Sequence, residues 1–472
     1  MVFSNLIFLY LFLPLCLAAY FLCRSVPAKN AVLIVFSLIF YAWGEPVYLF
    51  LMIAAAAVNW GFGLLIEKRH KRVFLVLALV LDLGYLAVFK YTGFVVENLN
   101  ALFGASIPVP VIALPIGISF YTFQALSYTV DVWRGDVPAQ RSFAKFLLYI
   151  SLFPQLIAGP IVRYADVAGQ IDARSFDAAD AFYGATRFCI GLAKKVLLAD
   201  AAGKVAAQIL DGSAASATTA AAWLGIVLYT FEIYFDFSGY SDMAIGMGRI
   251  FGFKYPENFR LPYTSRSITE FWRRWHISLG SFFRDYVYIP LGGKKKHQIL
   301  NMAIVWALTG LWHGASWNFV LWGLYYFVLL MLDRLFWQKL LDKLPKAVSA
   351  VLSHITLPLA VLFGWVLFKF TSLPLAAAVV RGMFCGNGNA FTSFTATAEI
   401  KSHMYLLIFC AAAATPVFSH LAKRWERAGE ESVLARKSYS VAACGIAPVL
   451  LLLISTACLV GNSFNPFLYF RF

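Results

Sequence analysis

Long apolar stretches follow one another along almost the whole chain, separated by short polar segments. Residues 6–22, 73–89, 351–370 and 439–461 are four examples. Each approaches the roughly 20 residues that a membrane-spanning helix requires, and the chain holds about ten to twelve such candidates. Only helices and closed barrels satisfy the backbone inside lipid, and stretches of this length indicate helices. The pattern predicts an all-α integral membrane protein, a polytopic bundle of about 10–12 transmembrane helices.

The composition agrees with this pattern. Hydrophobic residues make up 61% of the chain and charged residues only 13%, against about 25% charged residues in an ordinary soluble domain. No repeat of fixed period and no linker rich in Pro, Gly or Ser divides the sequence. We therefore expect a single membrane domain that covers residues 1–472 and is surrounded by membrane lipid.

The net charge of +15 would suggest a nucleic-acid partner in a soluble protein. In a membrane protein it is expected from topology, because Lys and Arg accumulate in cytoplasmic loops and near anionic head groups. No nucleic-acid partner is therefore expected. If Arg24, Lys29 and the basic segment 68–72 are cytoplasmic, two short helices lie between them and turn outside near residues 44–46. This arrangement places the N-terminus outside.

Charged and aromatic residues mix in the longest interruption of the apolar pattern. Ser267 and Glu270 have the spacing of a capping box, in which each side chain satisfies a backbone amide at the start of a helix. The apolar residues that follow recur at steps of three and four, which predicts one continuous amphipathic helix. Arg273 and His276 lie on its polar face. Such a helix lies in the membrane interface or dips into a cavity.

His313 lies in the middle of an almost uninterrupted apolar stretch, residues 301–331. An ionisable side chain inside the membrane is costly, so it usually faces the bundle interior or a water-filled cavity and marks a functional site. The alternative is a core histidine that hydrogen-bonds across a helix interface. Gly310 and Gly314 stand four apart, a spacing that lets a neighbouring helix approach closely or leaves space for a substrate.

Three acidic residues, Glu232, Asp236 and Asp242, interrupt another apolar run. Carboxylates in a membrane helix need partners, and the arginines near Arg273 are the expected ones. A proton pathway through Glu232, Asp236 and His313 is the rival interpretation, in which the chain is a proton-coupled transporter. The lack of a repeated hydropathy pattern weighs against a transporter.

Several reaction signatures are missing. The chain has no G-x-x-x-x-G-K-[ST], H-E-x-x-H or G-x-S-x-G motif, which disfavours nucleotide hydrolysis, metalloprotease and serine-hydrolase chemistry. The seven cysteines include no C-x-x-C pair, so the spacing of zinc and iron–sulfur sites is missing too. We expect no bound metal and no bound cofactor.

Short motifs around both histidines resemble a known family. The segment FWRRWHISL at 271–279, followed by GLWHG at 310–314, resembles the membrane-bound O-acyltransferase family, in particular its bacterial branch typified by the alginate O-acetylation protein. Similar stretches follow in the same order along nearly the whole chain, among them PIGISFY at 115–121, FPQLIAGP at 153–160 and NPF at 465–467.

The resemblance implies interfacial or re-entrant amphipathic helices around a central tunnel, with His313 as a catalytic residue and His276 as a second functional residue. It implies acyl transfer from a cytoplasmic thioester, acetyl-CoA or another acyl-CoA or an acyl carrier, to a hydroxyl towards the outer side. A separate extracytoplasmic acetyltransferase, together with polysaccharide synthesis and export machinery, is the implied partner. The implied location is the cytoplasmic (inner) membrane of a bacterium.

The chemistry suits these residues. A neutral imidazole can remove the proton of a hydroxyl as it attacks a thioester, which is worth about 10² to 10⁴ in rate, and an apolar setting disfavours the charged imidazolium. Trp312 is expected to wall the site and Asn318 to hydrogen-bond an oxyanion. Arg273 and Arg274 are candidates for binding coenzyme A phosphates, with lipid head groups as the alternative ligand. Asp236 completes the predicted substrate- and donor-binding set.

The leading interpretation is an O-acyltransferase that moves an acyl group, expected to be acetyl, for O-acetylation of an extracytoplasmic polysaccharide. The nearest alternative is D-alanyl transfer from a carrier-protein thioester to teichoic acid, because that branch shares the paired histidine motifs. The NPF stretch at 465–467 and the IPLGG stretch at 289–293 look more like the polysaccharide acetylation branch.

Overall fold

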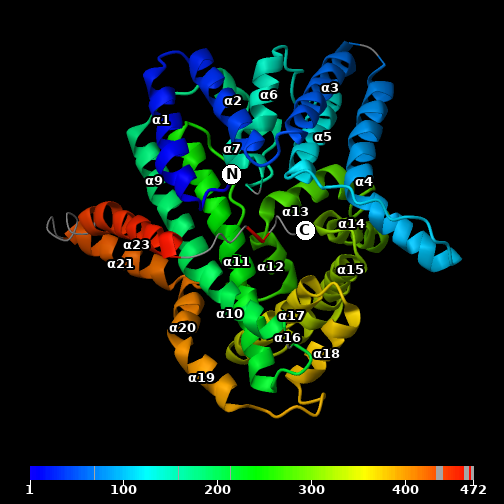
Figure 1. The fold of residues 1–472 in the computed structure, drawn as a ribbon, viewed down its shortest axis with the longest axis vertical. Coiled ribbons are helices and arrows are strands. Elements are labelled where there is room, and N and C mark those ends of the chain that lie inside the picture. The colour runs from blue at the N-terminus through cyan, green and yellow to red at the C-terminus, as the bar shows by residue number, and fades with distance from the viewer. Residues whose placement is uncertain (69, 158, 213, 432–439, 462–466, 469–472) are drawn as a thin grey trace.

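The computed structural model describes residues 1–472 except 69, 158, 213, 432–439, 462–466 and 469–472. Every regular element among the described residues is helical (Figure 1), which confirms the all-α expectation. The α-helices are α1 Leu13–Leu22, α2 Val26–Ala42, α3 Tyr48–Lys68, α4 Lys71–Phe103, α5 Ile118–Arg134, α6 Phe143–Ser151, α7 Phe153–Leu156, α8 Tyr164–Asp172, α9 Ala178–Ala193, α10 Asp200–Leu210, α11 Thr219–Ile250, α12 Ile268–Arg274, α13 Ile277–Phe283, α14 Gln298–His313, α15 Trp317–Leu332, α16 Gln338–Leu341, α17 Lys346–Lys369, α18 Leu373–Met383, α19 Phe394–Ser402, α20 Met404–Ala413, α21 Val417–Glu431 and α23 Ala447–Gly461. Short π-helical segments span Phe8–Phe12, Lys194–Ala199, Arg284–Tyr288, Asp333–Trp337 and Ser440–Ile446, and a 3₁₀ turn spans Pro262–Thr264.

Five helices of the described chain are long and apolar enough to cross a membrane: α3, α4, α11, α17 and the stretch Trp317–Leu341. A sixth span results if α20 and the first part of α21, which meet at 65°, count as one broken helix. The shorter apolar helices are Phe8–Leu22, Val26–Ala42, Leu373–Met383 and Ala447–Gly461. The expected count of about ten to twelve spans therefore exceeds what length and hydropathy support in the described residues, because several apolar stretches form shorter helices.

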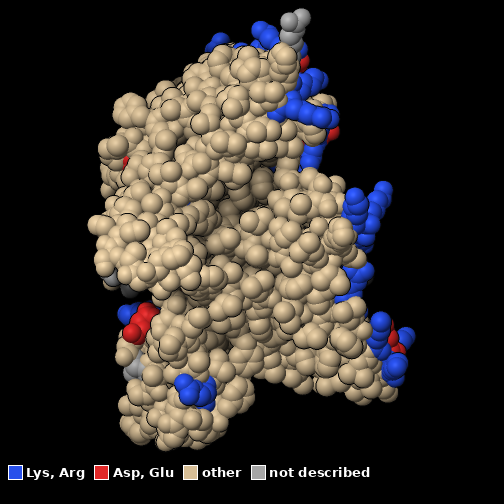
Figure 2. Space-filling model, turned by 90° about the vertical axis from the view of Figure 1, so that its right-hand side faces the viewer, with Lys and Arg blue, Asp and Glu red and all other residues tan. Residues whose placement is uncertain are grey.

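The surface of the bundle suits a lipid environment. Most Lys and Arg side chains visible in Figure 2 lie along one edge and the top of the molecule, and the broad face beside them is almost uncharged. Large apolar side chains are widely exposed, such as Leu22 at 82% and Val80 at 61%. Contiguous exposed apolar surface of this extent is rare on soluble proteins. The chain is therefore a multi-pass membrane protein.

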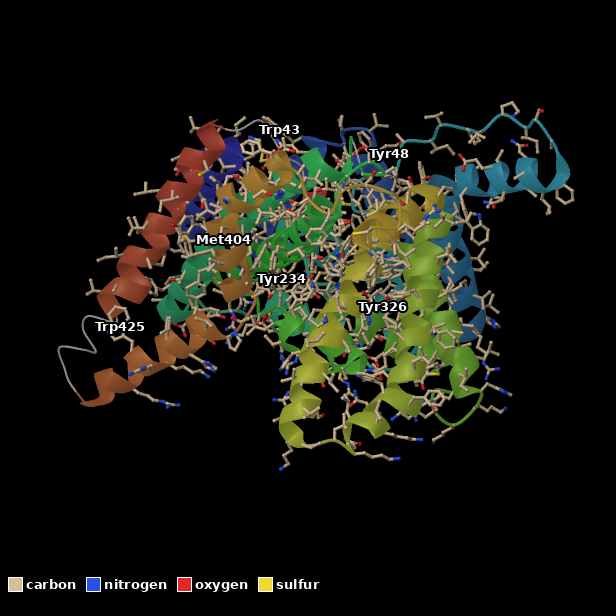
Figure 3. All side chains as sticks on the ribbon, turned by 90° about the horizontal axis from the view of Figure 1, so that it is seen from below. Trp43, Tyr48, Tyr234, Tyr326, Met404 and Trp425 are labelled. Carbon is tan, nitrogen blue, oxygen red and sulfur yellow. The ribbon has the colours of Figure 1, made fainter. Side chains whose placement is uncertain are left out.

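Trp43 and Tyr48 lie at one end of the bundle in Figure 3, whereas Trp425 lies at its side on helix α21. Such Trp and Tyr residues are typical of the aromatic belts at membrane–water interfaces. The backbone nitrogen of Met1 lies 3.7 Å from the position that a Cβ atom on Gly44 would take. The N-terminus and the turn near residue 44 thus lie on the same side, and their placement outside the cell stays a prediction.

The central helix of the fold is α11, and its close packing against α9 depends on glycines. A Cβ atom on Gly184 or Gly191 would overlap the carbonyl oxygen of Gly246 or Gly239, respectively, on α11. Small residues at such spacing let two helix backbones approach closely in a membrane. This contact places the basic residues at the end of α9 directly beside the acidic residues of α11.

Asp236 of α11 finds its partners there. Lys195 Nζ lies 2.7 Å from Asp236 Oδ1 and 2.6 Å from Asp200 Oδ1, and the backbone N–H of Leu468 donates to Asp236 Oδ2 at 2.7 Å. Both Lys195 and Asp236 are buried. The ion pair therefore joins Asp236 to the segment after α9, so the expected pairing with the arginines near Arg273 was wrong for this residue.

Asp242 is likewise paired within this helix pair. Its carboxylate lies 2.8 Å from Arg187 Nη2 and 2.7 Å from Lys194 Nζ, and Arg187 also pairs with Glu257 at 2.5 Å. The expectation that arginines near Arg273 serve Asp242 was wrong as well. The reason is spatial, because α9 is the immediate neighbour of α11 and the sequence does not reveal which helices pack together.

Candidate functional site

The start of α12 follows the predicted capping pattern in part. Ser267 accepts a hydrogen bond from the Glu270 N–H at 3.0 Å, as expected for a cap. The Glu270 carboxylate accepts instead from the N–H of Arg266, at 2.8 Å, and not from Ser267. The helix therefore begins where the sequence predicted, but the Glu270 side chain accepts from the backbone N–H one residue before Ser267.

The expected continuous amphipathic helix is broken at His276. Its backbone adopts a left-handed conformation with φ 46°, and α12 and α13 lie on either side of it. The preceding segment satisfies the backbone at the break, since Arg260 N–H donates to Arg274 O at 2.9 Å and Ile277 N–H donates to Asn258 O at 3.0 Å. Buried backbone groups without partners are costly, so these bonds stabilise the break.

The break also changes which way the side chains point. Phe271 and Trp275 belong to one hydrophobic cluster of the core, whereas Phe282 and Phe283 belong to another. The prediction that these residues share one continuous apolar face was therefore wrong. His276, expected on the polar face, is only 2% exposed.

Asn258 fixes the orientation of the His276 ring. The Oδ1 atom of Asn258 lies 3.2 Å from His276 Nδ1 and also accepts hydrogen bonds from the Ser278 N–H at 3.2 Å and the Ser278 hydroxyl at 2.9 Å. A backbone N–H can only donate, so Asn258 presents its oxygen here. The neutral His276 ring then donates from Nδ1 and carries its lone pair on Nε2.

His313 is the last residue of α14, and Gly314 continues in extended backbone. The apolar stretch 301–331 is divided here by a turn between α14 and α15, so His313 lies in an apolar helix, at its end. The ring is buried, 5% exposed, and its centroid lies 4.9 Å from that of Trp322 on α15 and 5.2 Å from that of Phe368 on α17.

Trp312 stands between the two histidines. Its ring centroid lies 5.0 Å from that of His313 and 5.7 Å from that of His276. The ring centroids of Phe120 and Phe123 of α5 lie 5.5 and 5.8 Å from that of Trp312. The structure thus brings together three predicted site residues, supplied by the α12–α13 break and the end of α14, in a setting walled by aromatic rings.

The glycines beside His313 serve helix packing. A Cβ atom on Gly310 would overlap the carbonyl oxygen of Phe319, and one on Gly314 would overlap the Phe319 ring. Of the two uses expected for this spacing, close approach of α15 is the one that the structure supports.

The other predicted site residues have their described partners elsewhere. Asn318 donates from Nδ2 to Leu367 O at 3.1 Å and contacts the Ser316 hydroxyl. Arg274 pairs with Glu270 at 2.5 Å, and Arg273 is exposed. Their roles in binding substrate, like that of Asp236, stay predictions.

Lys90 and Tyr91 of α4 were missed by the sequence reasoning. Lys90 Nζ donates to Trp312 O at 2.5 Å, and the Tyr91 hydroxyl donates to Leu311 O at 2.8 Å. Lys90 directly follows an apolar run, which is the same signal of an ionisable side chain at membrane depth that singled out His313.

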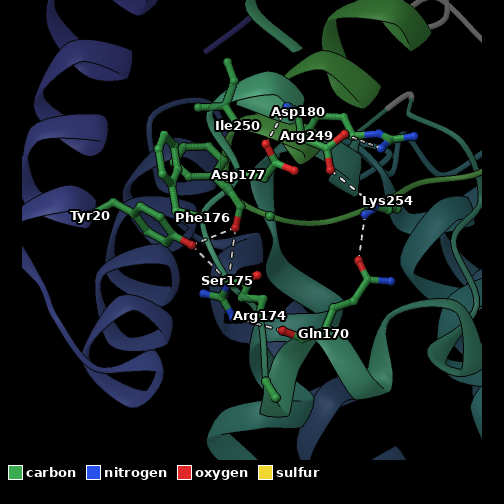
Figure 4. Close-up of a pocket in the computed structure, with 13 residues that line it drawn as sticks. Tyr20, Gln170, Arg174, Ser175, Phe176, Asp177, Asp180, Arg249, Ile250 and Lys254 are labelled. Carbon is green, nitrogen blue, oxygen red and sulfur yellow. Dashed lines mark hydrogen bonds and ion pairs between the residues drawn. The ribbon is translucent and has the colours of Figure 1, made fainter. Parts of the chain in front are cut away.

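A polar cavity of about 250 Å³ lies at the ends of α1, α9 and α11 (Figure 4). Asp180 bridges Arg249 at 2.7 Å and Lys254 at 3.2 Å across it. The hydrogen bond from Lys254 and the nearby Arg249 hold the pKa of the Asp180 carboxyl below its usual range. Neither His276 nor His313 lines this cavity. Within the described residues, no group of three or more His, Cys, Asp or Glu is placed to hold a metal ion.

Comparison with known proteins adds a family and several relatives. Residues 114–373 match the model of the MBOAT, membrane-bound O-acyltransferase family. The chain is 39% identical to the probable alginate O-acetylase AlgI of Azotobacter vinelandii, with 100% of both chains covered. It is 34% identical to the peptidoglycan O-acetyltransferase of Helicobacter pylori over 82% of this chain and 80% of that protein. The teichoic acid D-alanyltransferase of Bacillus subtilis is 32% identical over 49% of this chain and 62% of its own length. These relatives are acyltransferases, so the transporter interpretation is set aside.

Proposed function

The chain belongs to the membrane-bound O-acyltransferase family and is an acyltransferase, and from that premise we propose that it supplies acetyl groups for O-acetylation of an extracytoplasmic polysaccharide. The donor is a cytoplasmic thioester, acetyl-CoA or an acyl carrier. The observation that carries the proposal is the buried pair His313 and His276 around Trp312, in a chain that aligns along its full length with an alginate O-acetylase.

In the proposed reaction His313 is the general base. It takes the proton of the acceptor hydroxyl while the hydroxyl oxygen attacks the thioester carbonyl carbon. The new C–O bond forms, the C–S bond breaks, and the proton passes to the departing thiolate. General-base assistance of this kind is worth about 10² to 10⁴ in rate. The buried aromatic setting of His313 keeps the imidazole in the neutral form that the step requires.

His276 is proposed to orient the acceptor. Its Nδ1–H is held by Asn258, so the ring offers the lone pair of Nε2 to a hydroxyl. Arg273, exposed at the end of α12, is the candidate for contacting donor phosphates.

The location and partners belong to the same proposal. We place the whole chain, residues 1–472, as one domain in the inner membrane of a bacterium. It hands the acetyl group to a separate extracytoplasmic acetyltransferase that works beside the polysaccharide synthesis and export machinery. D-alanyl transfer is the weaker alternative, since the D-alanyltransferase of Bacillus subtilis aligns with 49% of the chain whereas the alginate O-acetylase aligns with all of it.

Mass spectrometry of surface glycans tests the proposal. Cells with the chain, without it, and complemented with His313→Ala are compared. We expect acetyl esters on a surface polysaccharide only when the active chain is present. Loss of D-alanine esters without any change in acetylation would contradict the acetyl proposal, and unchanged glycans in all three strains would contradict acyl transfer to a polysaccharide.

Asn258 provides a sharper test of the site geometry. Asn258→Leu should lower acyl transfer about tenfold or more, because the ring of His276 loses the acceptor that sets its tautomer and orientation, and small misplacements of catalytic groups can cost up to about 10²-fold. Initial rates of the protein in liposomes measure this. Asn258→Asp keeps an acceptor oxygen and is expected to retain most of the activity, so a fully active Asn258→Leu variant would refute the role.

A further inference from the structure

Lys90 lies near the middle of α4, a long apolar helix. Only 17% of the apolar part of this helix is buried inside the protein. A lysine at this depth is costly in lipid and needs a partner, often a backbone carbonyl. Its described partner is the carbonyl oxygen of Trp312, 2.5 Å from Nζ. Trp312 directly precedes His313, so this hydrogen bond falls one residue before the histidine.

The hydrogen bond from Lys90 reaches the C-terminal end of α14, where a donor from outside the helix is needed. The last carbonyls of a helix have no donors from the helix itself, and a cation near them is stabilising. At this end the last backbone bond is a long one, from the Gly314 N–H to Gly310 O, with 3.4 Å between nitrogen and oxygen. The carbonyl oxygens of the residues after Gly310 therefore depend on donors from outside the helix. The Tyr91 hydroxyl donates to Leu311 O at 2.8 Å, and the Lys90 ammonium group donates to the next carbonyl oxygen, that of Trp312.

The same face of α4 holds the other side of the turn. Asn98 Oδ1 accepts a hydrogen bond from the Trp317 indole N–H at 2.8 Å, and the Phe94 ring lies 5.7 Å from the Trp317 ring. Trp317 is the first residue of α15. Consecutive turns of α4 therefore contact both the residue before His313 and the residue that restarts the helix after it.

We propose that Lys90 is a positioning residue for acyl transfer: it caps the C-terminal end of α14 and thereby holds the His313 ring at the place of reaction. Tyr91 and Asn98 assist on either side of it. The inference rests on the proposed role of His313 as general base. It explains a cation in a lipid-facing helix, because packing in lipid alone gives no reason for a lysine there.

The kinetic test uses three variants of Lys90 in liposomes, with acetyl-CoA or an acetylated carrier as donor. Lys90→Met keeps the length of the side chain and removes both donor and charge. Lys90→Gln keeps a donor, and Lys90→Arg keeps donor and charge. Thr92→Val is the matched control on the same helix, because its hydroxyl donates to Val88 O within α4.

We expect kcat of Lys90→Met to fall about 10- to 100-fold, the effect of displacing a catalytic group, with the KM for the donor within about twofold of its normal value. Lys90→Arg should recover most of the rate and Lys90→Gln part of it, and Thr92→Val should be unchanged. Tyr91→Phe combined with Lys90→Met should lower kcat further than Lys90→Met alone, since the two side chains donate to different carbonyl oxygens of the same helix end. Hydrogen exchange of residues 309–320 should speed up in Lys90→Met, and this readout applies even if its activity is too low to measure.

Two results would overturn the inference. Unchanged kcat in Lys90→Met shows that the cap does not position His313, and a raised KM with unchanged kcat shows that Lys90 binds the donor instead. His313→Ala, run in parallel, separates the two proposals. If His313→Ala is inactive while Lys90→Met has normal kcat, only the positioning role fails, whereas a fully active His313→Ala variant removes the proposed role of His313 as general base.

Discussion

His313→Ala is expected to abolish acyl transfer while the protein still folds and inserts. The ring is buried among Trp312, Trp322 and Phe368, at the end of a helix and not in its middle. A loss of at least about 10² to 10⁴ in rate is the ordinary effect of removing a general base. Initial rates in liposomes and glycan analysis of complemented cells both measure it.

The control for this variant is another histidine in an apolar helix. His354 of α17 is exposed at the surface of the bundle, so His354→Ala makes the same chemical change outside the site and should keep full activity. Elution profiles in detergent show whether both variants remain folded. Full activity in a folded His313→Ala variant would mean that the proton is taken by another group, and the proposed mechanism would have to be abandoned.

Lys195→Met is expected to produce the largest loss of stability. The Lys195 ammonium group lies between Asp236 and Asp200 at 2.7 and 2.6 Å, and the side chains of Lys195 and Asp236 are 4% and 3% exposed. Without the lysine, the Asp236 carboxylate stays buried with the Leu468 N–H as its described partner. Removing one member of a buried ion pair typically costs about 3–5 kcal/mol. Thermal unfolding in detergent or nanodiscs should show the loss as a lowered midpoint and a poorer yield.

A second substitution distinguishes charge burial from simple loss of packing. Lys195→Met combined with Asp236→Leu removes both charges and should regain much of the stability, because an apolar pair of similar size is often neutral or better. Lys204→Met, on the exposed side of α10, is the matched control and should change little. If the double variant is less stable than Lys195→Met alone, the unpaired buried charge is not the cause of the loss, and this explanation fails.

The local sequence patterns were sufficient for the class of the protein, and they supplied the candidate site residues. The length and hydropathy of the apolar stretches determine an all-α membrane protein, because lipid leaves the backbone no other way to satisfy its hydrogen bonds in segments of this kind. The cost of an imidazole at membrane depth singles out His313 from the sequence alone. The motifs around His276 and His313 indicated the family that the comparison then established.

Only the tertiary structure decided how these residues are held. Asn258 and Arg260 supply the hydrogen bonds that let the predicted amphipathic helix break at His276, and periodicity within residues 267–286 carries no information about that outside segment. Likewise, Lys90 caps the helix that ends at His313 although 222 positions separate it from Trp312 in the chain. The sequence determines which side chains are costly in lipid. Which residue provides the hydrogen bond or ion pair for each buried polar side chain depends on contacts between distant helices. These contacts exist only once the bundle has packed.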